Sequence, residues 1–235
     1  MCTVSVVSSN GKVIITSNRD EKANRPAIEP KRYCVGNKVL VFPKDTKAGG
    51  TWYAVSDDGV VVVLLNGAAE KHEIRPNYKK SRGLITLEIC SAKDVLQQWQ
   101  VIDLKTIEPF TLVIFFDKKL YQLRWDGDKK TTQELAASEN YIWSSSTLYS
   151  EAVRQKRQQW FEIFVAQKPC PNTEDVLHFH QYTQGNNKEY GLVIDRDDML
   201  KTTSITQTVL DANKVTMVYH DLLQQESHTN SFIII

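Results

Sequence analysis

A chain of 235 residues with 41% hydrophobic and 24% charged residues has the composition of a globular protein with a substantial core. Its formal net charge of +1 gives no electrostatic reason to bind nucleic acid or acidic membranes, so neither is expected as a partner. The sequence has no apolar run long enough to span a membrane and does not open with a basic and apolar leader, so we expect a cytoplasmic protein.

The first third of the chain alternates short apolar runs with turn residues, a pattern typical of β-hairpins. Asn10-Gly11 is the strongest hairpin signal and predicts strands over 3–7 and 12–16. Further strands are predicted over 39–42, 52–55 and 60–65. The last of these is a continuous apolar run, so we expect it to be covered on both faces.

The rest of the chain predicts helices and strands in alternating blocks. Helices are predicted over 80–90, 92–100, 148–167 and 173–182, with Ser91 as a cap and Thr173 as an N-cap. Strands are predicted over 111–116, 120–125, 141–143, 203–210, 214–221 and 232–235. This order favours an α+β fold in which helices cover antiparallel sheets, and no linker divides 1–235, so one domain is expected. The basic group at 154–157 has the pattern of a solvated helix face.

The Asn10-Gly11 turn also predicts the register of the first hairpin. Counting outward from the turn places Cys2 opposite Arg19, on a mostly apolar face that points to the interior. A fixed positive charge lowers the pKa of a nearby thiol and makes it more nucleophilic. The plain alternative is that Cys2 is incidental and that 18–21 is a solvated strand end. The register, the arginine opposite Cys2 and the acid beside that arginine are separate observations, and together they favour a catalytic role for Cys2.

A free amine on Cys2 would complete such a site. We expect Met1 to be removed, because methionine aminopeptidases act when the second residue is as small as Cys. Asp20 lies one step past Arg19, where its carboxylate would hold the amine of Cys2 in place. The amine would then serve as the base for its own thiol, as in N-terminal threonine enzymes.

Neither the other cysteines nor the histidines suggest a metal site. Cys34, Cys90 and Cys170 form no CxxC pair and are expected to be buried small hydrophobes, so no metal or cofactor is expected. His178 and His180 are two apart on a predicted helix and therefore diverge, which favours surface or packing roles.

Several short motifs together resemble one known family. Met1-Cys2-Thr3 followed by Ser17-Asn18-Arg19-Asp20-Glu21 resembles the opening of the NRDE family, also called the transport and Golgi organisation protein 2 family. Gly49-Gly50-Thr51-Trp52 and Leu65-Asn66 are similar to two further blocks of the family, and Thr206-Gln207-Thr208 is a weaker match near the end.

The resemblance implies the four-layer αββα sandwich of N-terminal-nucleophile hydrolases. It also implies chemistry like that of penicillin V acylases and bile salt hydrolases, which cleave non-peptide C–N amide bonds. By the resemblance Cys2 is the nucleophile, Arg19 lies beside its sulfur and Asp20 binds the α-amine. Asn66 is then a candidate oxyanion donor, and a capping or turn residue is its alternative role. Asn18, Trp52 and Ser145 are candidates for substrate contact.

The sequence departs from those acylases at two places. Ser144-Ser145-Ser146 stands where they use a further Asn, and 201–208 contains no Arg where they use a late one. Two functions therefore stay open. The first is a cysteine amidohydrolase for a small-molecule amide, and the second is a carrier of a hydrophobic or haem-like ligand on the same fold without turnover.

Overall fold

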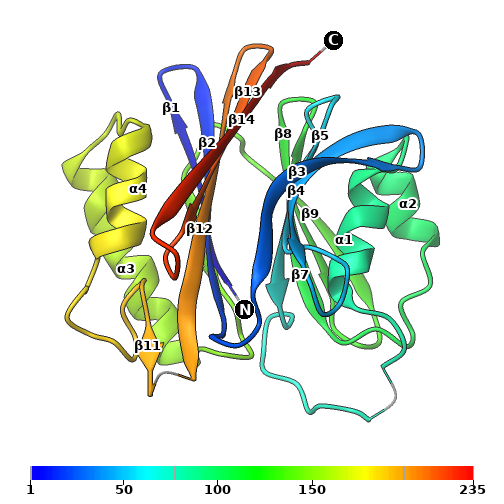
Figure 1. The fold of residues 1–235 in the computed structure, drawn as a ribbon, viewed down its shortest axis with the longest axis horizontal. Helices are drawn as coiled ribbons and strands as arrows, with labels where there is room; N and C mark the ends of the chain where they lie inside the picture. The colour runs from blue at the N-terminus through cyan, green and yellow to red at the C-terminus, as the bar shows by residue number, and fades with distance from the viewer. Residues whose placement is uncertain (1, 77, 198, 235) are drawn as a thin grey trace.

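The chain folds into two antiparallel sheets that lie face to face, each covered on its outer side by two helices (Figure 1). The structure is a computed structural model that describes residues 2–76, 78–197 and 199–234. The strands are β1 (Cys2–Ser9), β2 (Lys12–Lys22), β3 (Ala27–Val35), β4 (Lys38–Asp45), β5 (Tyr53–Ser56), β6 (Val61–Asn66), β7 (Phe110–Phe116), β8 (Lys119–Trp125), β9 (Lys130–Leu135), β10 (Tyr141–Ser144), β11 (Asp195–Arg196), β12 (Leu200–Asp211), β13 (Lys214–Asp221) and β14 (Glu226–Ile233). The helices are α1 (Arg82–Cys90), α2 (Val95–Val101), α3 (Glu151–Gln167) and α4 (Thr173–Tyr182).

The topology separates the chain into two sheets with different strand orders. The first sheet runs β10-β1-β2-β12-β13-β14, with β11 paired to β12, and the second is a meander from β3 to β9. Helices α3 and α4 contact the first sheet, and α1 contacts the second. The predicted αββα sandwich of antiparallel sheets is therefore confirmed.

Three of the strands that the sequence pattern missed or recognised only in part lie at sheet edges. β3 and β9 are the two edges of the second sheet, and β14 is an edge of the first and begins well before the predicted strand at 232–235. Each carries many polar residues. The four middle positions of β9 are all exposed, and most positions of β14 alternate between exposed and half-buried. An edge strand exposes unpaired backbone groups that could pair with another chain, and polar residues oppose such pairing. Apolar periodicity therefore does not reveal edge strands.

The helices begin where a capping side chain satisfies the first free backbone N–H groups. The second helix begins at Val95 after its cap Asp94, whereas Ser91 ends the first helix. The third begins after its cap Ser150, three residues later than predicted. The fourth keeps its predicted bounds, but its N-cap is Asn172, which forms a reciprocal capping box with Asp175.

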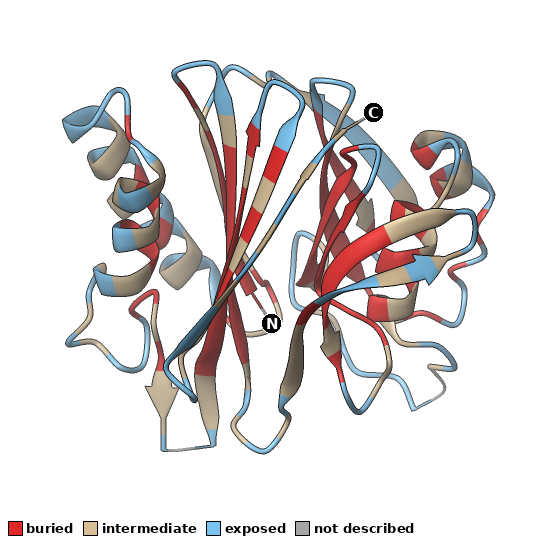
Figure 2. Cartoon of the chain, turned by 45° about the horizontal axis from the view of Figure 1, so that its top comes forward, coloured by how far each residue is buried: buried red, intermediate tan, exposed pale blue. Residues whose placement is uncertain are grey.

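Two hydrophobic layers hold the sandwich together, and Figure 2 shows buried residues concentrated on the sheets and on the helix sides that face them. The larger layer fills the space between the sheets and continues under α1 and α2, and Cys2 belongs to it. The smaller layer lies between the first sheet and helices α3 and α4, around Phe161 and Phe179. The β1–β2 hairpin thus has one face in each layer.

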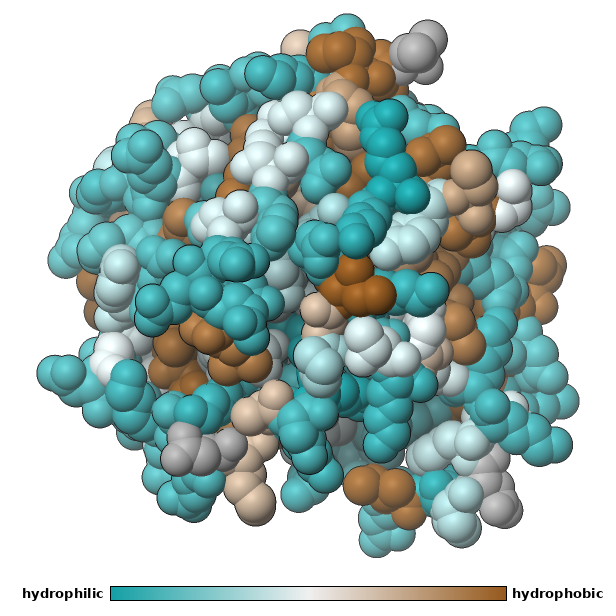
Figure 3. Space-filling view, viewed as in Figure 1, coloured by the Kyte–Doolittle hydropathy of each residue, from teal (hydrophilic) through white to brown (hydrophobic). Residues whose placement is uncertain are grey.

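The surface carries no continuous apolar face in the view of Figure 3, where brown residues lie scattered among hydrophilic ones. Among the described residues, no helix combines the length and the apolar character needed to cross a membrane.

Candidate functional site

The first hairpin has the register that its turn predicts. Cys2 pairs with Arg19 and Thr3 pairs with Asn18 across β1 and β2. Directly opposed residues point to the same side of a sheet. Both side chains lie in the interior, with Cys2 at 1% and Arg19 at 3% exposure.

Arg19 is fixed by contacts on several sides. Its Nη2 lies 3.1 Å from Oδ2 of Asp45, and its guanidinium stacks over the Trp52 ring at 4.3 Å from the centroid. Nη1 donates to the carbonyl of Arg25 at 3.1 Å and to Oγ1 of Thr203 at 3.2 Å. Arg19 is therefore a rigid cation whose charge is shared with a carboxylate.

The thiol of Cys2 is less acidic than the sequence suggested. Burial raises its pKa, and the negative charge of Asp20 raises it further, while Arg19 lowers it by a smaller amount. The expectation that Arg19 would leave Cys2 with a lowered pKa is wrong for this form of the chain, because desolvation outweighs the cation. Met1 lies outside the described residues, and its removal stays a prediction.

Asp20 lies on the opposite side of β2 from Arg19 and faces the helical layer. The Tyr149 hydroxyl donates to its Oδ2 at 2.8 Å, and the Thr202 hydroxyl donates to its Oδ1 at 2.7 Å. Burial raises the pKa of the Asp20 carboxyl, and the charge of Arg157 acts in the opposite direction. Cys2 and Arg19 are the last register pair of β1 and β2, so Asp20 extends one residue beyond that pair, towards the backbone nitrogen of Cys2.

A β-bulge in β12 supplies partners to both faces of β2. The register between β12 and β2 shifts between Thr202 and Ser204, which leaves Thr203 as the extra residue. As a result, Thr202 reaches Asp20 on the helix side and Thr203 reaches Arg19 on the inner side. One irregularity in β12 therefore positions both Arg19 and Asp20.

Arg157 contradicts the prediction of a solvated helix face over 154–157. Its side chain is fully buried, its guanidinium stacks on the Tyr149 ring at 3.7 Å, and it donates to Thr3 and to the carbonyl of Tyr190. Arg157 follows Val153 by four residues and precedes Phe161 by four, so it occupies the apolar stripe of α3. That spacing is the signal that would have found it.

A small cavity of about 80 Å³ lies beside Arg19, and Trp52 and Asn66 also line it. Gly50 lines it too, and a Cβ at Gly50 would lie 2.4 Å from the backbone carbon of Gly83 at the start of α1, so only glycine fits there. The Gly49-Gly50-Thr51-Trp52 block therefore lets the start of α1 pack closely against the segment that precedes β5, at the cavity wall. The structure brings together three predicted site residues at this point.

Ser145 links the nucleophile candidate to a second, larger cavity. Its backbone N–H donates to the carbonyl of Cys2 at 3.0 Å, and its hydroxyl donates to the carbonyl of Asn66 at 2.7 Å. Ser144, Ser145 and Ser146 line a cavity of about 450 Å³ between the sheets and α3. The serine stretch thus occupies the cavity wall beside Cys2, at the start of β1.

Asn18 does not lie at either cavity. It is fully buried on the helix side, where its Nδ2 donates to the carbonyls of His180 and Leu192 at 3.1 and 2.8 Å. Its Oδ1 therefore accepts from Nδ1 of His180 at 2.6 Å, and Nε2 of that ring accepts from the Ser5 hydroxyl at 2.7 Å. His180 is a neutral packing residue, as expected, and burial lowers its pKa to about 3.

The remaining cysteines differ in exposure. Cys90 is buried as expected, but Cys34 and Cys170 are exposed, so the expectation is wrong for those two. Cys34 lies on the polar edge strand β3 and Cys170 in the loop after α3, and neither position faces a core. Among the described residues, no group of three His, Cys, Asp or Glu side chains could hold a metal ion.

The family follows from comparison of the whole chain. The family model described as Transport and Golgi organisation 2 matches residues 1–231. The chain belongs to this family. No curated protein matches the chain at a significant level.

This Transport and Golgi organisation 2 family member shares its fold with solved structures of low sequence identity. A Caenorhabditis elegans ortholog of N-acylethanolamine-hydrolyzing acid amidase is 12% identical, with a TM-score of 0.62 over 89% of this chain and 92% of that chain. A mutant conjugated bile acid hydrolase from Clostridium perfringens is 8% identical, with a TM-score of 0.56 over 100% and 92%. Penicillin V acylase from Agrobacterium tumefaciens is 7% identical, with a TM-score of 0.54 over 97% and 85%. These likenesses show an N-terminal-nucleophile hydrolase fold.

Sequence reasoning missed four polar residues that hold the site of this Transport and Golgi organisation 2 family member. Asp45 ends β4 and binds Arg19, while Tyr149, Arg157 and Thr202 surround Asp20. Tyr149 and Thr202 carry no pattern that distinguishes them from other polar residues near element ends. Asp45 is also a turn residue, accepting from the backbone of Lys47 and Ala48, and that role hides its contact with Arg19.

Proposed function

We propose that the chain is a cysteine amidohydrolase that cleaves a non-peptide C–N amide bond of a small substrate, with Cys2 as its N-terminal nucleophile after removal of Met1. The observation that carries the proposal is the pairing of Cys2 with Arg19 on a hydrolase fold, beside a cavity that Asn66 also lines. The amidase, bile acid hydrolase and acylase that share the fold supply the reaction class.

The proposed reaction has two halves. The α-amine of Cys2 takes the thiol proton, and the thiolate attacks the amide carbonyl to form a tetrahedral intermediate. The protonated amine then gives its proton to the leaving nitrogen as the C–N bond breaks, which leaves an S-acyl thioester. Water deprotonated by the same amine hydrolyses the thioester, and this step returns the thiol and releases the acid.

Three other residues have separate roles in this proposal. Arg19 favours the thiolate, and Asp20 holds the α-amine in its orientation for proton transfer. The side-chain N–H of Asn66 donates to the developing oxyanion, a contact typically worth a factor of about 100 to 1,000 in rate. Trp52 backs the Arg19 guanidinium, and Ser145 forms part of the wall on the other side of Cys2.

The proposal includes removal of Met1 and a cytoplasmic location. Loss of Met1 creates the amine that the reaction needs. A cytoplasmic location keeps the thiol reduced. Intact-mass measurement of protein expressed in a cytoplasm tests the first step, and complete retention of Met1 would contradict the catalytic proposal.

The direct test is turnover of a panel of N-acyl amides by Met1-free protein and by variants. Cys2→Ala is expected to abolish hydrolysis without loss of fold, and Cys2→Ser to retain far less activity, because an alkoxide forms much less readily than a thiolate. Asn66→Ala is expected to lower the rate by about 100-fold. The matched control is the Cys34→Ala, Cys170→Ala double variant, which removes the two exposed thiols and is expected to keep full turnover.

A carrier without turnover is the second candidate, and two observations favour it. The thiol of Cys2 is buried with a raised pKa, and serines occupy 144–146 where the acylases use a further Asn. This function predicts binding of a hydrophobic or haem-like ligand together with no hydrolysis of any amide by Met1-free protein. Full hydrolysis that depends on Cys2 would exclude it.

A further inference from the structure

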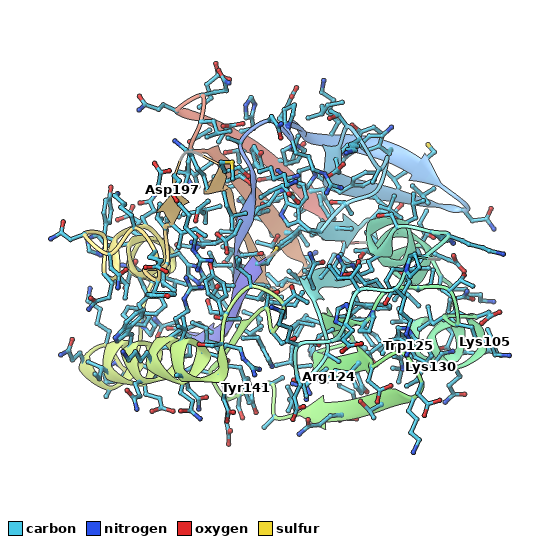
Figure 4. The ribbon with its side chains drawn as sticks, turned by 90° about the horizontal axis from the view of Figure 1, so that it is seen from below. Lys105, Arg124, Trp125, Lys130, Tyr141 and Asp197 are labelled. Carbon is cyan, nitrogen blue, oxygen red and sulfur yellow. The ribbon has the colours of Figure 1, made fainter. Side chains whose placement is uncertain are left out.

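The cavity of about 450 Å³ beside Ser145 carries two arginines with no acidic partner. It lies at one end of the space between the sheets, where Leu65, Thr111 and Arg124 form one wall. β10 forms the opposite wall through Trp143, and Arg154 of α3 closes the side. Figure 4, seen from below, shows Arg124 on the side of the second sheet that is nearer to Tyr141 of β10.

Both guanidiniums keep unused hydrogen-bonding capacity inside the cavity. The Nε atoms of Arg124 and Arg154 are buried and have no hydrogen-bond partner. Nη1 of Arg154 donates to the carbonyl of Ala69 at 2.8 Å. Within 2–76, 78–197 and 199–234, no carboxylate lies within ion-pair distance of either side chain.

The two positive charges also act on each other. Burial lowers the pKa of Arg124, and the charge of Arg154 lowers it further, so the two side chains are close enough to repel. Two carboxylates line the cavity, Glu70 and Glu151, but both residues are solvent-exposed and neither pairs with an arginine. Two half-buried guanidiniums whose Nε atoms are buried and unpaired are costly unless an anion completes them, and their planar donors suit carboxylate and phosphate oxygens.

Backbone links join residues of the cavity wall to the candidate nucleophile and to Asn66. Ser145 lines it and donates its N–H to the carbonyl of Cys2, while Leu65 lines it and directly precedes Asn66. The hydroxyls of Ser145, Ser146 and Thr111 donate to backbone carbonyls, so they present oxygen and not hydrogen to the space. Among the described residues that line the cavity, the two arginines are therefore the cationic donors that an anion would meet.

We propose that Arg124 and Arg154 bind an anionic group of the substrate, a carboxylate or a phosphate, and so select amides that carry one. This inference rests on the proposed function for its identification of the anion as part of the substrate. The anion site itself needs no turnover, and it is tested by binding alone.

The binding test uses inorganic phosphate and the full chain, titrated by calorimetry at constant ionic strength set with chloride. The wild type is expected to bind phosphate saturably. Arg154→Gln and Arg124→Gln are each expected to weaken binding by about tenfold, since each removes a charge-assisted contact. Lys156→Gln is the matched control, because it removes the same charge from an exposed position of the same helix and is expected to leave binding unchanged.

The phosphate affinities of these variants show whether the two arginines form an anion site. Equal phosphate affinity of the wild type and Arg154→Gln would overturn it, as would an equal loss in Lys156→Gln. Arg154 occupies a half-buried position of a helix, so we expect Arg154→Gln to fold. The binding test can then be made with this variant alone if Arg124→Gln fails to fold. Arg154→Lys should recover part of the affinity, because it keeps the charge without the planar fork.

A second measurement separates this inference from the proposed function. With Met1-free enzyme, KM for an amide bearing a free carboxylate should rise in Arg154→Gln, while KM for its methyl ester stays unchanged. Equal KM values for the acid in wild type and variant would overturn substrate selection. Phosphate binding without hydrolysis of any amide would instead contradict the proposed function and leave the anion site standing.

Discussion

Asp45 and Arg19 form an ion pair in which Oδ2 of the carboxylate lies 3.1 Å from Nη2 of the guanidinium. The same oxygen lies 2.8 Å from Nε of Arg25, so Asp45 is shared between two cations. The guanidinium charge opposite Cys2 is therefore partly neutralised by this carboxylate. The balance of charge at the nucleophile candidate is set by a residue of the second sheet.

Removal of that negative charge should activate the thiol. In Asp45→Asn the shape is retained and the acceptor for Lys47 and Ala48 remains, but Arg19 is no longer neutralised. We expect the pKa of Cys2 to fall, and labelling by iodoacetamide at pH 7 to become about tenfold faster for each unit of pKa, as long as the pKa stays above the pH. The rate is measured on Met1-free protein by mass spectrometry of the Cys2 peptide. Asp103→Asn, at an exposed position, is the control, and equal rates in both variants would contradict this role of Asp45.

The Tyr149 hydroxyl should stabilise the ionised form of Asp20. Tyr149→Phe removes the donor 2.8 Å from Oδ2, and a hydrogen bond to a charged group contributes about 1.5–3 kcal/mol. The pKa of Asp20 then rises further above its ordinary value, so the lost stability is largest at neutral pH and shrinks as acid protonates the carboxyl. Urea unfolding at pH 7 and pH 4 measures this. The exposed Tyr182→Phe should show no such change, and a loss that is independent of pH would assign Tyr149 to packing alone.

His180 should make the fold sensitive to acid. Its pKa is lowered to about 3 in the folded state against 6.5 ordinarily, so the unfolded chain binds a proton that the folded chain refuses. Stability from this residue is complete above about pH 6.5 and is lost as the pH falls towards 3, by about 1.4 kcal/mol per unit. His180→Gln removes this dependence, so the stability gap between wild type and variant should narrow by about 2 kcal/mol between pH 7 and pH 5. His178→Gln on the same helix is exposed and should track the wild type; a constant gap for His180→Gln would disprove the assignment.

The close approach of α1 to the cavity wall should depend on Gly50. In Gly50→Ala the new Cβ would lie 2.4 Å from the backbone of Gly83, and backbone cannot yield as a flexible side chain does. We expect a loss of more than about 3 kcal/mol in the free energy of unfolding. Gly36→Ala is the comparison: it is strained at φ +60 but has no atom within 4 Å, and should cost about 1–2 kcal/mol. Similar costs for both variants would show that the close contact does not matter.

The first hairpin could be predicted in detail because its register is local. A two-residue turn at Asn10-Gly11 fixes every pair out to Cys2 and Arg19 through hydrogen bonds within one sheet pair. The α+β class, with helices outside antiparallel sheets, could be predicted because apolar periodicity reveals buried strands and helices. The four-layer order followed from the resemblance to the family. The polar edge strands β3, β9 and β14 carry no such signal.

The electrostatic surroundings of the site could not be predicted, because they come from residues distant in sequence. Asp45 reaches Arg19 from the other sheet, and Tyr149 and Thr202 reach Asp20 from two further segments. The sign of the Cys2 pKa shift depends on burial, which only the packed sandwich establishes. Sequence placed the arginine opposite the cysteine but not the carboxylate that neutralises it.

The most direct measurement of the central claim is the location of an acyl adduct on Met1-free protein. The protein is mixed at pH 7 with an activated acyl ester, quenched in acid, and mapped by peptide mass spectrometry. Acylation is expected at Cys2, ahead of the exposed thiols of Cys34 and Cys170, and the adduct should disappear on a longer incubation as water hydrolyses the thioester. Acylation confined to Cys34 and Cys170, with Cys2 unmodified in protein confirmed to lack Met1, would contradict the assignment of Cys2 as the nucleophile.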